Sequence, residues 1–376
     1  MGGTIDTTRG IAPSSAVISR NFFVPFSAWF ASHFIGFLGL VIWPTRSGEW
    51  FNTFGLTHMD GGWYRIIVTS GFPNGPLPDH ATAWPFFPLY PWIADLFIRV
   101  GAPVGPALIS VSWIFALVAM IGVWQLTFEM FGRDVAVMSV WTFALLPGAV
   151  GQVLAYSDSL FAAGLVWTLF LLHRLPNSST ESNSPSIGAF ALVGLCASVV
   201  VASRPNGALF LIAVVHAIWQ NSRWRRALPL ALLPSVVFLG CWMIYCHNKT
   251  GDTFVFLSAK SAWLERTIID FITYPTERPA NLLHVAVLVI VVTLAWKRWS
   301  DIPRHWITAS VVLIGPSMIL GIEGLARYVT ITVPASIMVA LTLARHERHR
   351  QVLFLGIAGS AMLFLAVNVV RSSWVP

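Results

Sequence analysis

Apolar stretches long enough to cross a lipid bilayer recur from Phe22 to Val370. A transmembrane helix needs about 20 consecutive apolar residues. Only 10% of the 376 residues are charged, against about 25% in a typical soluble domain. No segment between the apolar stretches has the composition of a soluble domain. The sequence therefore predicts an all-α, polytopic membrane protein with a single domain over residues 1–376.

About eleven transmembrane helices are expected. The first apolar run, Phe22–Trp43, is too long for the core of a cleaved signal peptide and is expected to be an uncleaved span. The stretch Phe86–Val100 reads either as an interfacial helix or as a further span. The expected spans are 22–43, 106–128, 134–150, 157–173, 187–203, 206–219, 228–247, 282–296, 306–322, 328–344 and 352–371.

Three short basic loops orient the chain. They are Arg223–Arg226, Lys297–Arg304 and Arg345–Arg350, and an even number of spans separates them. The positive-inside rule places all three in the cytoplasm, together with the N-terminus. Two long loops, at about 44–105 and 248–281, then lie outside the cytoplasm, and a bacterial plasma membrane is the expected location.

The net charge of +7 does not indicate nucleic acid as a partner, because Lys and Arg are spread over short loops and build no continuous basic face. The three cysteines all lie in apolar segments without metal-ligand spacing and are expected to pack between helices. No metal and no cofactor are expected.

The first long loop contains a carboxylate beside two glycines, Asp60-Gly61-Gly62. Glycines let a ligand approach the backbone closely, and nearby aromatic side chains can exclude water. Asp60 is therefore the leading candidate for a general base. The alternatives are a helix cap or an ion-pair partner for Arg65. Candidate substrate-binding residues in this loop are His58, Trp63, Tyr64, Arg65 and Tyr90.

The next outer edge reads Tyr156-Ser157-Asp158-Ser159, after a Pro147-Gly148 break. Asp158 suits the positive end of a helix dipole, so it is a candidate helix cap or structural partner. It is equally a candidate ligand-binding residue, together with Tyr156.

The stretch Ser203-Arg204-Pro205-Asn206-Gly207 interrupts an apolar region. A charged residue there is costly to bury and is a functional candidate by default. Arg204, beside Asn206, has a planar donor fork that suits a phosphate. The alternative is a tight outer turn with a snorkelling arginine.

Further candidates lie in the second long loop and before the tenth span. Lys260 and Trp263 are candidate substrate-binding residues of that loop. Arg327 and Tyr328 follow Glu323, so Arg327 is either an anion ligand or the partner of Glu323. The joint position of carboxylates, arginines and aromatic side chains on one face fits transfer from a lipid-phosphate donor, since cations stabilise a departing phosphate while a carboxylate accepts a hydroxyl proton.

The sequence resembles the PIG-V family of polyprenyl-phosphate-mannose-dependent mannosyltransferases, within the GT-C superfamily. The resemblance rests on motifs in family order over about three quarters of the chain. They are His58–Tyr64, Phe86–Pro91, Tyr156–Phe161, Ser203–Gly207, Gly251-Asp252 with Trp263, and Ala326–Tyr328 with Pro334.

The resemblance implies a GT-C-type fold with structured outer loops and an inverting, metal-independent transfer of mannose from a polyprenyl-phosphate-mannose donor. The family's catalytic acidic residue maps onto Asp60. Two positions depart from the family pattern: Met59 replaces the usual Trp, and Asp158 replaces the usual Glu.

The expected partners are a lipid-linked sugar donor, membrane lipids and an acceptor that is a glycan, a glycolipid or a protein. A transporter or flippase of a lipid-linked sugar is the rival interpretation, because it too needs intramembrane charges and broken helices.

Overall fold

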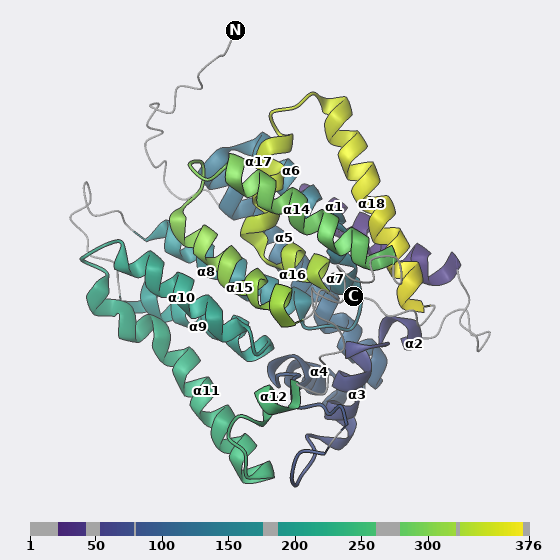
Figure 1. Cartoon of the computed structure of the whole chain (residues 1–376), viewed down its shortest axis with the longest axis vertical. Coiled ribbons are helices and arrows are strands. Elements are labelled where there is room, and N and C mark those ends of the chain that lie inside the picture. The colour runs from purple at the N-terminus through teal and green to yellow at the C-terminus, as the bar shows by residue number, and fades with distance from the viewer. Residues whose placement is uncertain are drawn as a thin grey trace.

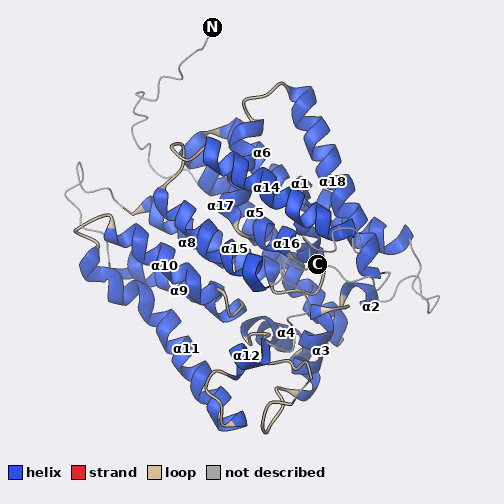
Figure 2. Cartoon of the chain, in the orientation of Figure 1, coloured by secondary structure: helices blue, strands red, loops and turns tan. Residues whose placement is uncertain are grey.

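The computed structural model describes residues 22–42, 53–78, 80–175, 187–260, 279–320 and 324–370. Within these ranges the regular structure is helical and contains no strand, which confirms the all-α prediction (Figure 2). The helices form a bundle in which segments from both halves of the sequence lie side by side (Figure 1).

The first half of the chain supplies the central helix of the bundle. This helix, α5, carries apolar residues on all sides and packs against α1, α6 and α8, so it is buried by protein rather than by lipid. The helices of this half are α1 (Phe23–Ile42), α2 (Thr53–Leu56), α3 (Asp60–Ser70), α4 (Leu89–Arg99), α5 (Val104–Phe131), α6 (Arg133–Leu145), the 3₁₀ turn η1 (Pro147–Ala149), α7 (Val150–Val153) and α8 (Asp158–Arg174).

The second half supplies the buried helices α16 and α17 and several helices on the flanks of the bundle. Its long helix α11 packs on α9 and turns much of its apolar surface outward. The helices are α9 (Ile187–Ser203), α10 (Gly207–Trp219), the 3₁₀ turn η2 (Arg225–Ala227), α11 (Leu228–Thr250), α12 (Val255–Ser258), α14 (Pro279–Lys297), α15 (Arg304–Leu320), α16 (Leu325–Ile331), α17 (Val333–Leu343) and α18 (Arg348–Val370).

Each expected span contains a helix, although several helices are shorter than a bilayer requires. Among the described residues, α5, α11 and α18 are long and apolar enough to cross a membrane. Two bent pairs raise this number to five if each pair is one span: α6 with η1 and α7, bent by 67°, and α16 with α17, bent by 78°. The fold is thus that of an integral membrane protein, and the count of eleven spans stays a prediction.

The first long loop is itself helical. The stretch Phe86–Val100 contains α4, whose 11 residues rise about 16 Å and cannot cross a bilayer of about 30 Å, so it is not a span. The second long loop begins with α12. The two loops meet, because the Gly75 amide donates to the Lys249 carbonyl at 2.9 Å and Phe87 packs edge-on against Phe256.

Candidate active site

Asp60 is the first residue of α3, and an unusual backbone conformation precedes it. Met59 has a φ of 55°, in the left-handed region that side chains with a Cβ rarely adopt. The amides of Gly61 and Gly62 donate to the carbonyls of His58 and Met59, which closes the turn. Such local strain is typical of functional sites. The strained turn directs the chain into α3 with Asp60 at its positive end.

Asp158 is the first residue of α8, after the broken helix α6–η1–α7. The chain before it is held from two sides: the Ala155 amide donates to the Leu56 carbonyl at 2.8 Å, and the Tyr156 amide donates to Ser112 Oγ at 3.1 Å. The cap position belongs to Ser157, so Asp158 is not the helix cap that its sequence position also allowed. It is completely buried.

Arg327, on α16, binds both carboxylates. Its Nη2 donates to Asp60 Oδ2 at 2.9 Å, and its Nε donates to Asp158 Oδ2 at 2.7 Å. The guanidinium lies over the Tyr156 ring, 4.4 Å from the centroid. Asp60 is therefore an ion-pair partner of Arg327, whereas Arg65 is exposed on α3. Glu323, the expected alternative partner of Arg327, lies outside the described residues.

Arg204 forms the second cation of the cluster. Its Nη2 pairs with Asp158 Oδ1, and its Nε donates to Ser157 Oγ at 3.1 Å. The side chain is 9% exposed and points into the protein, so it does not snorkel to the surface. Its Nη1 is buried without a hydrogen-bond partner among the described residues. A buried charged donor without a partner is an available binding group for an anionic oxygen.

Two glycines permit this arrangement. A Cβ at Gly151 would lie 2.0 Å from Asp158 Oδ2 and 3.2 Å from Arg327 Nε. A Cβ at Gly148 would lie 2.1 Å from the Ala326 carbonyl oxygen. Only glycine lets α16 approach the broken helix closely enough for Arg327 to reach both carboxylates.

Aromatic side chains of α3 and α4 pack beside the charged cluster. The Tyr64 hydroxyl donates to Ser157 Oγ at 2.8 Å, and burial raises the pKa of Tyr64 above its usual range, so Tyr64 stays protonated. The Tyr90 hydroxyl donates to the Leu108 carbonyl at 2.7 Å. Trp63 stacks on Phe86, with ring centroids 6.0 Å apart. Tyr64 and Tyr90 are thus buried, whereas Trp63 is half-buried.

The other expected site residues lie around this cluster. His58 is half-buried, and burial lowers its pKa, which favours the neutral ring. Tyr328 lies under Arg204, 5.4 Å from ring centroid to guanidinium carbon. Asn206 occupies the cap position of α10 without a side-chain cap bond. Lys260 is half-buried, with no ion pair to the cluster in the described ranges, and Trp263 lies outside those ranges.

The cluster therefore contains two carboxylates and two guanidinium groups. It is graded in exposure: Asp158 is 0% exposed, whereas the Asp60 side chain is 28% exposed. Asp60 is the carboxylate that a substrate can reach, and Asp158 is the one that holds both arginines. No group of three or more His, Cys, Asp or Glu side chains converges within the described residues. Metal independence stays a prediction.

Sequence reasoning missed Gly151 and His284 as parts of this site. His284 is completely buried on α14, and its Nδ1 accepts the Ala326 amide at 3.2 Å. A lone histidine within an apolar span was a usable signal, because ionisable residues there are costly. Nothing in the local sequence marks Gly151, whose role depends on a helix about 175 residues later in the chain.

A family model described as dolichyl-phosphate-mannose-protein mannosyltransferase matches residues 79–247. The match covers less than half of the chain, with Asp158 and Arg204 inside it and Asp60 and Arg327 outside it. Among curated proteins, none matches the sequence.

Solved structures of larger proteins share the fold. ArnT from Cupriavidus metallidurans bound to undecaprenyl phosphate has a TM-score of 0.57 and 13% identity, over 88% of this chain and 62% of that chain. Its apo form has a TM-score of 0.52 and 14% identity, over 92% and 65%. Arabinofuranosyltransferase AftD from Mycobacteria has a TM-score of 0.53 and 15% identity, over 92% and 27%. The chain thus has the GT-C-type fold and spans less than two thirds of each of these proteins.

Proposed function

We propose that the protein is a GT-C-type glycosyltransferase that transfers mannose from a polyprenyl-phosphate-mannose donor to an acceptor hydroxyl. The observation that carries the proposal is the cluster of Asp60, Asp158, Arg204 and Arg327, in which an accessible carboxylate lies beside two buried arginines. The fold shared with ArnT, which was solved with undecaprenyl phosphate bound, supports a lipid-phosphate donor.

Asp60 acts as the general base in this mechanism. Its carboxylate accepts the proton of the acceptor hydroxyl, whose oxygen attacks the anomeric carbon of the sugar. The bond from that carbon to the phosphate oxygen breaks, and its electron pair stays with the departing polyprenyl phosphate. Attack opposite the leaving group inverts the anomeric configuration. No step requires a metal ion.

The arginines stabilise the negative charge that develops on the leaving phosphate. Arg204 is the better placed to contact it, because its Nη1 is buried and has no partner among the described residues. Arg327 holds Asp60 in position and adds a second positive charge. Preorganised donors in a water-poor site stabilise such charge without reorganising.

The remaining expected residues shape the two substrate sites. The half-buried rings of Trp63 and Tyr328 border the charged cluster and suit the apolar face of a sugar or the start of a prenyl chain. Lys260 and Trp263 belong to the second loop, whose described part packs on the first loop, and we assign both to donor binding. The acceptor is a glycan, a glycolipid or a protein.

An extracytoplasmic site is supported by the ends of the helices. Asp158 begins α8 and Arg174 ends it, about 24 Å away along the helix axis. The basic loops Lys297–Arg304 and Arg345–Arg350 meet, because Asp301 pairs with Arg298 at 3.2 Å and with Arg345 at 3.0 Å. The expected topology places both loops on the same side of the membrane as Arg174. The positive-inside rule assigns that end to the cytoplasm.

The decisive experiment measures sugar transfer from purified polyprenyl-phosphate-mannose by Asp60→Asn protein. Loss of the base is expected to lower turnover by about 10²–10⁴-fold. Asp95→Asn is the matched control, because Asp95 is an acidic residue of the same loop that pairs with Arg99 on its own helix. A folded Asp60→Asn protein with wild-type turnover removes Asp60 from this role.

The broken helices beside the cluster keep the transporter as a second candidate, since discontinuous helices line the binding sites of many transporters. Reconstituted vesicles separate the two functions. A transferase forms glycosylated product when donor and acceptor are added on the site's side. A flippase moves labelled donor across the bilayer and forms no product.

A further inference from the structure

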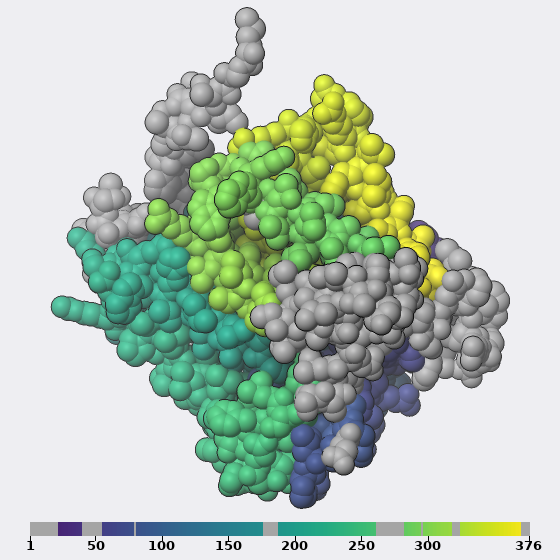
Figure 3. Space-filling model, in the orientation of Figure 1, coloured from purple at the N-terminus to yellow at the C-terminus, as the bar shows by residue number. Residues whose placement is uncertain are grey.

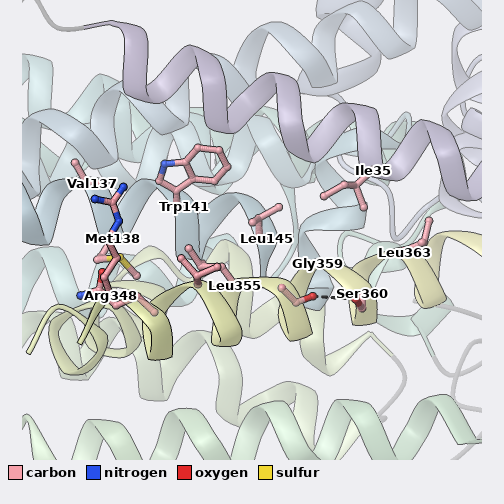
Figure 4. A pocket seen from close by; sticks show the side chains of 13 residues that line it. Ile35, Val137, Met138, Trp141, Leu145, Arg348, Leu355, Gly359, Ser360 and Leu363 are labelled. Carbon is pink, nitrogen blue, oxygen red and sulfur yellow. Dashed lines mark hydrogen bonds between the residues drawn. The ribbon is translucent and has the colours of Figure 1, made fainter. Parts of the chain in front are cut away.

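A long apolar groove runs between α6 and α18 and is bordered by Ile35 of α1 (Figure 4). It has a volume of about 640 Å³. This volume is in the range of small-molecule sites, about 300–1,000 Å³. α18 forms the upper right edge of the molecule in the space-filling view (Figure 3). The wall includes Trp141, Leu145, Leu355, Gly356, Leu363 and Arg348.

The groove is closed toward the catalytic cluster. Helix α1 approaches α18 so closely there that a Cβ at Gly39 would lie 2.5 Å from the Ala366 Cβ. One turn earlier, a Cβ at Gly36 would lie 2.8 Å from a methyl group of Val153 on α7. These contacts separate the groove from Asp60, so it is not a continuation of the donor site.

The opposite end of the groove is cationic. Arg348 lies there beside Val137 and Met138 (Figure 4) and is the one charged residue of the wall among those described. It is exposed and forms no ion pair within the described ranges. The neighbouring acid Glu347 pairs instead with His349 at 3.2 Å. The Arg348 guanidinium is thus available to bind an anionic group of another molecule.

Two of the other polar side chains of the wall donate to backbone carbonyls. Gln351 Nε2 donates to the carbonyls of Leu343 and His346, and the Ser360 hydroxyl donates to the Gly356 carbonyl of its own helix. The interior of the groove is therefore mainly apolar, and Arg348 is its one charged group among the described residues.

The groove is long enough to hold a lipid acyl chain. From Arg348 to Leu363 the helix rises about 22 Å, which exceeds the roughly 15 Å of hydrocarbon in one leaflet. Within this stretch nothing lies within 4 Å of a Cβ placed on Gly356, so the wall is open at that residue. An acyl chain can follow the groove from the headgroup level to the bilayer centre.

From these features we infer that the groove is a binding site for an anionic phospholipid of the leaflet opposite the catalytic cluster. The phosphate headgroup pairs with Arg348, and one acyl chain lies along Leu355, Gly356 and Leu363. The lipid fills the space between α6 and α18 and joins α18 to the bundle. This site is separate from the donor site and does not depend on the proposed reaction.

Native mass spectrometry of the full chain tests the site with three probes: phosphatidylglycerol, phosphatidylcholine and undecaprenyl phosphate. Wild-type protein is expected to bind one phosphatidylglycerol in preference to phosphatidylcholine. Arg348→Gln is expected to weaken phosphatidylglycerol binding about five-fold, the effect of one cation near the headgroups. Gly356→Phe, whose ring enters open space, is expected to abolish it.

Arg350→Gln is the matched control, because Arg350 is exposed on the same turn of α18 and does not line the groove. It is expected to bind phosphatidylglycerol as the wild type does. Four results overturn the inference. The first two are equal binding of both phospholipids and unchanged binding by Gly356→Phe. The third is loss of undecaprenyl phosphate rather than phosphatidylglycerol in that variant, which would assign the groove to the donor's chain. The fourth is a wild-type dimer that Gly356→Phe converts to a monomer, which would assign the groove to a second copy.

Discussion

Asp60 and Asp158 bind the same arginine but differ in how much water reaches them. Replacing Asp158 by Asn leaves Arg204 and Arg327 partly unpaired in a buried place, and breaking a buried ion pair costs about 3–5 kcal/mol. Replacing Asp60 by Asn removes a partly exposed pair worth about 0–1 kcal/mol. We therefore expect Asp158→Asn to lower the thermal unfolding midpoint strongly and Asp60→Asn to leave it nearly unchanged. Equal midpoints for the two variants would show that Asp158 is not the structural centre of the cluster.

Gly151 offers a second test at a single residue. Its substitution by Ala places a Cβ in the space of Asp158 Oδ2 and must displace the carboxylate or the Arg327 side chain. A displacement of about 1 Å in such a site can lower turnover about 100-fold. Gly240→Ala, in α11, is the control, because nothing lies within 4 Å of its new Cβ. Transfer assays on both variants check the prediction, which fails if Gly151→Ala is as active as the control.

The sequence singled out all four charged residues of the cluster but not their pairing. Arg204 was visible because a charge within an apolar stretch is costly, and Asp60 was visible from the two glycines that follow it. Their partners were not visible, because the Arg327–Asp60 and Arg327–Asp158 contacts join residues 267 and 169 positions apart. The sequence analysis instead offered partners that are close in sequence, such as Arg65 for Asp60.

At the scale of elements, hydropathy located the helices well and their breaks less well. The expected span 328–344 is two helices, α16 and α17, bent by 78°. Pro334 lies at the start of α17, where its missing amide removes a bond to the preceding turn. The Pro147-Gly148 break was visible for the same reason. The close approach of α16 to η1 requires the break between α16 and α17. The sequence did not reveal this approach, because it depends on tertiary contacts.

The position of α16 also depends on α14. The Ala326 amide is one of the free amides at the start of α16, and His284 Nδ1 accepts it. We expect His284→Leu to lower kcat about 5-fold, because the loss of a cap worth about 1 kcal/mol lets Arg327 shift. His284→Asn retains an acceptor near the position of Nδ1 and is expected to restore most of the rate. Equal loss in both variants would indicate that the ring's bulk matters rather than its acceptor.

The whole molecule places the catalytic cluster and the basic loops at opposite ends of shared helices, and this arrangement predicts a sidedness that labelling can check. Val100, 83% exposed beyond α4, marks the end with the cluster, and Trp299, 58% exposed between α14 and α15, marks the basic end. We introduce single cysteines at these positions in a background with the three native cysteines replaced by Ala. A membrane-impermeant maleimide added to intact cells is expected to label Val100→Cys at once and Trp299→Cys only after lysis, because positively charged loops stay in the cytoplasm. Labelling of Trp299→Cys alone in intact cells would invert the topology and place Asp60 in the cytoplasm. Labelling of both in intact cells would mean that the two ends do not face opposite sides of the bilayer. The proposal that the donor binds outside the cytoplasm would then have no structural support.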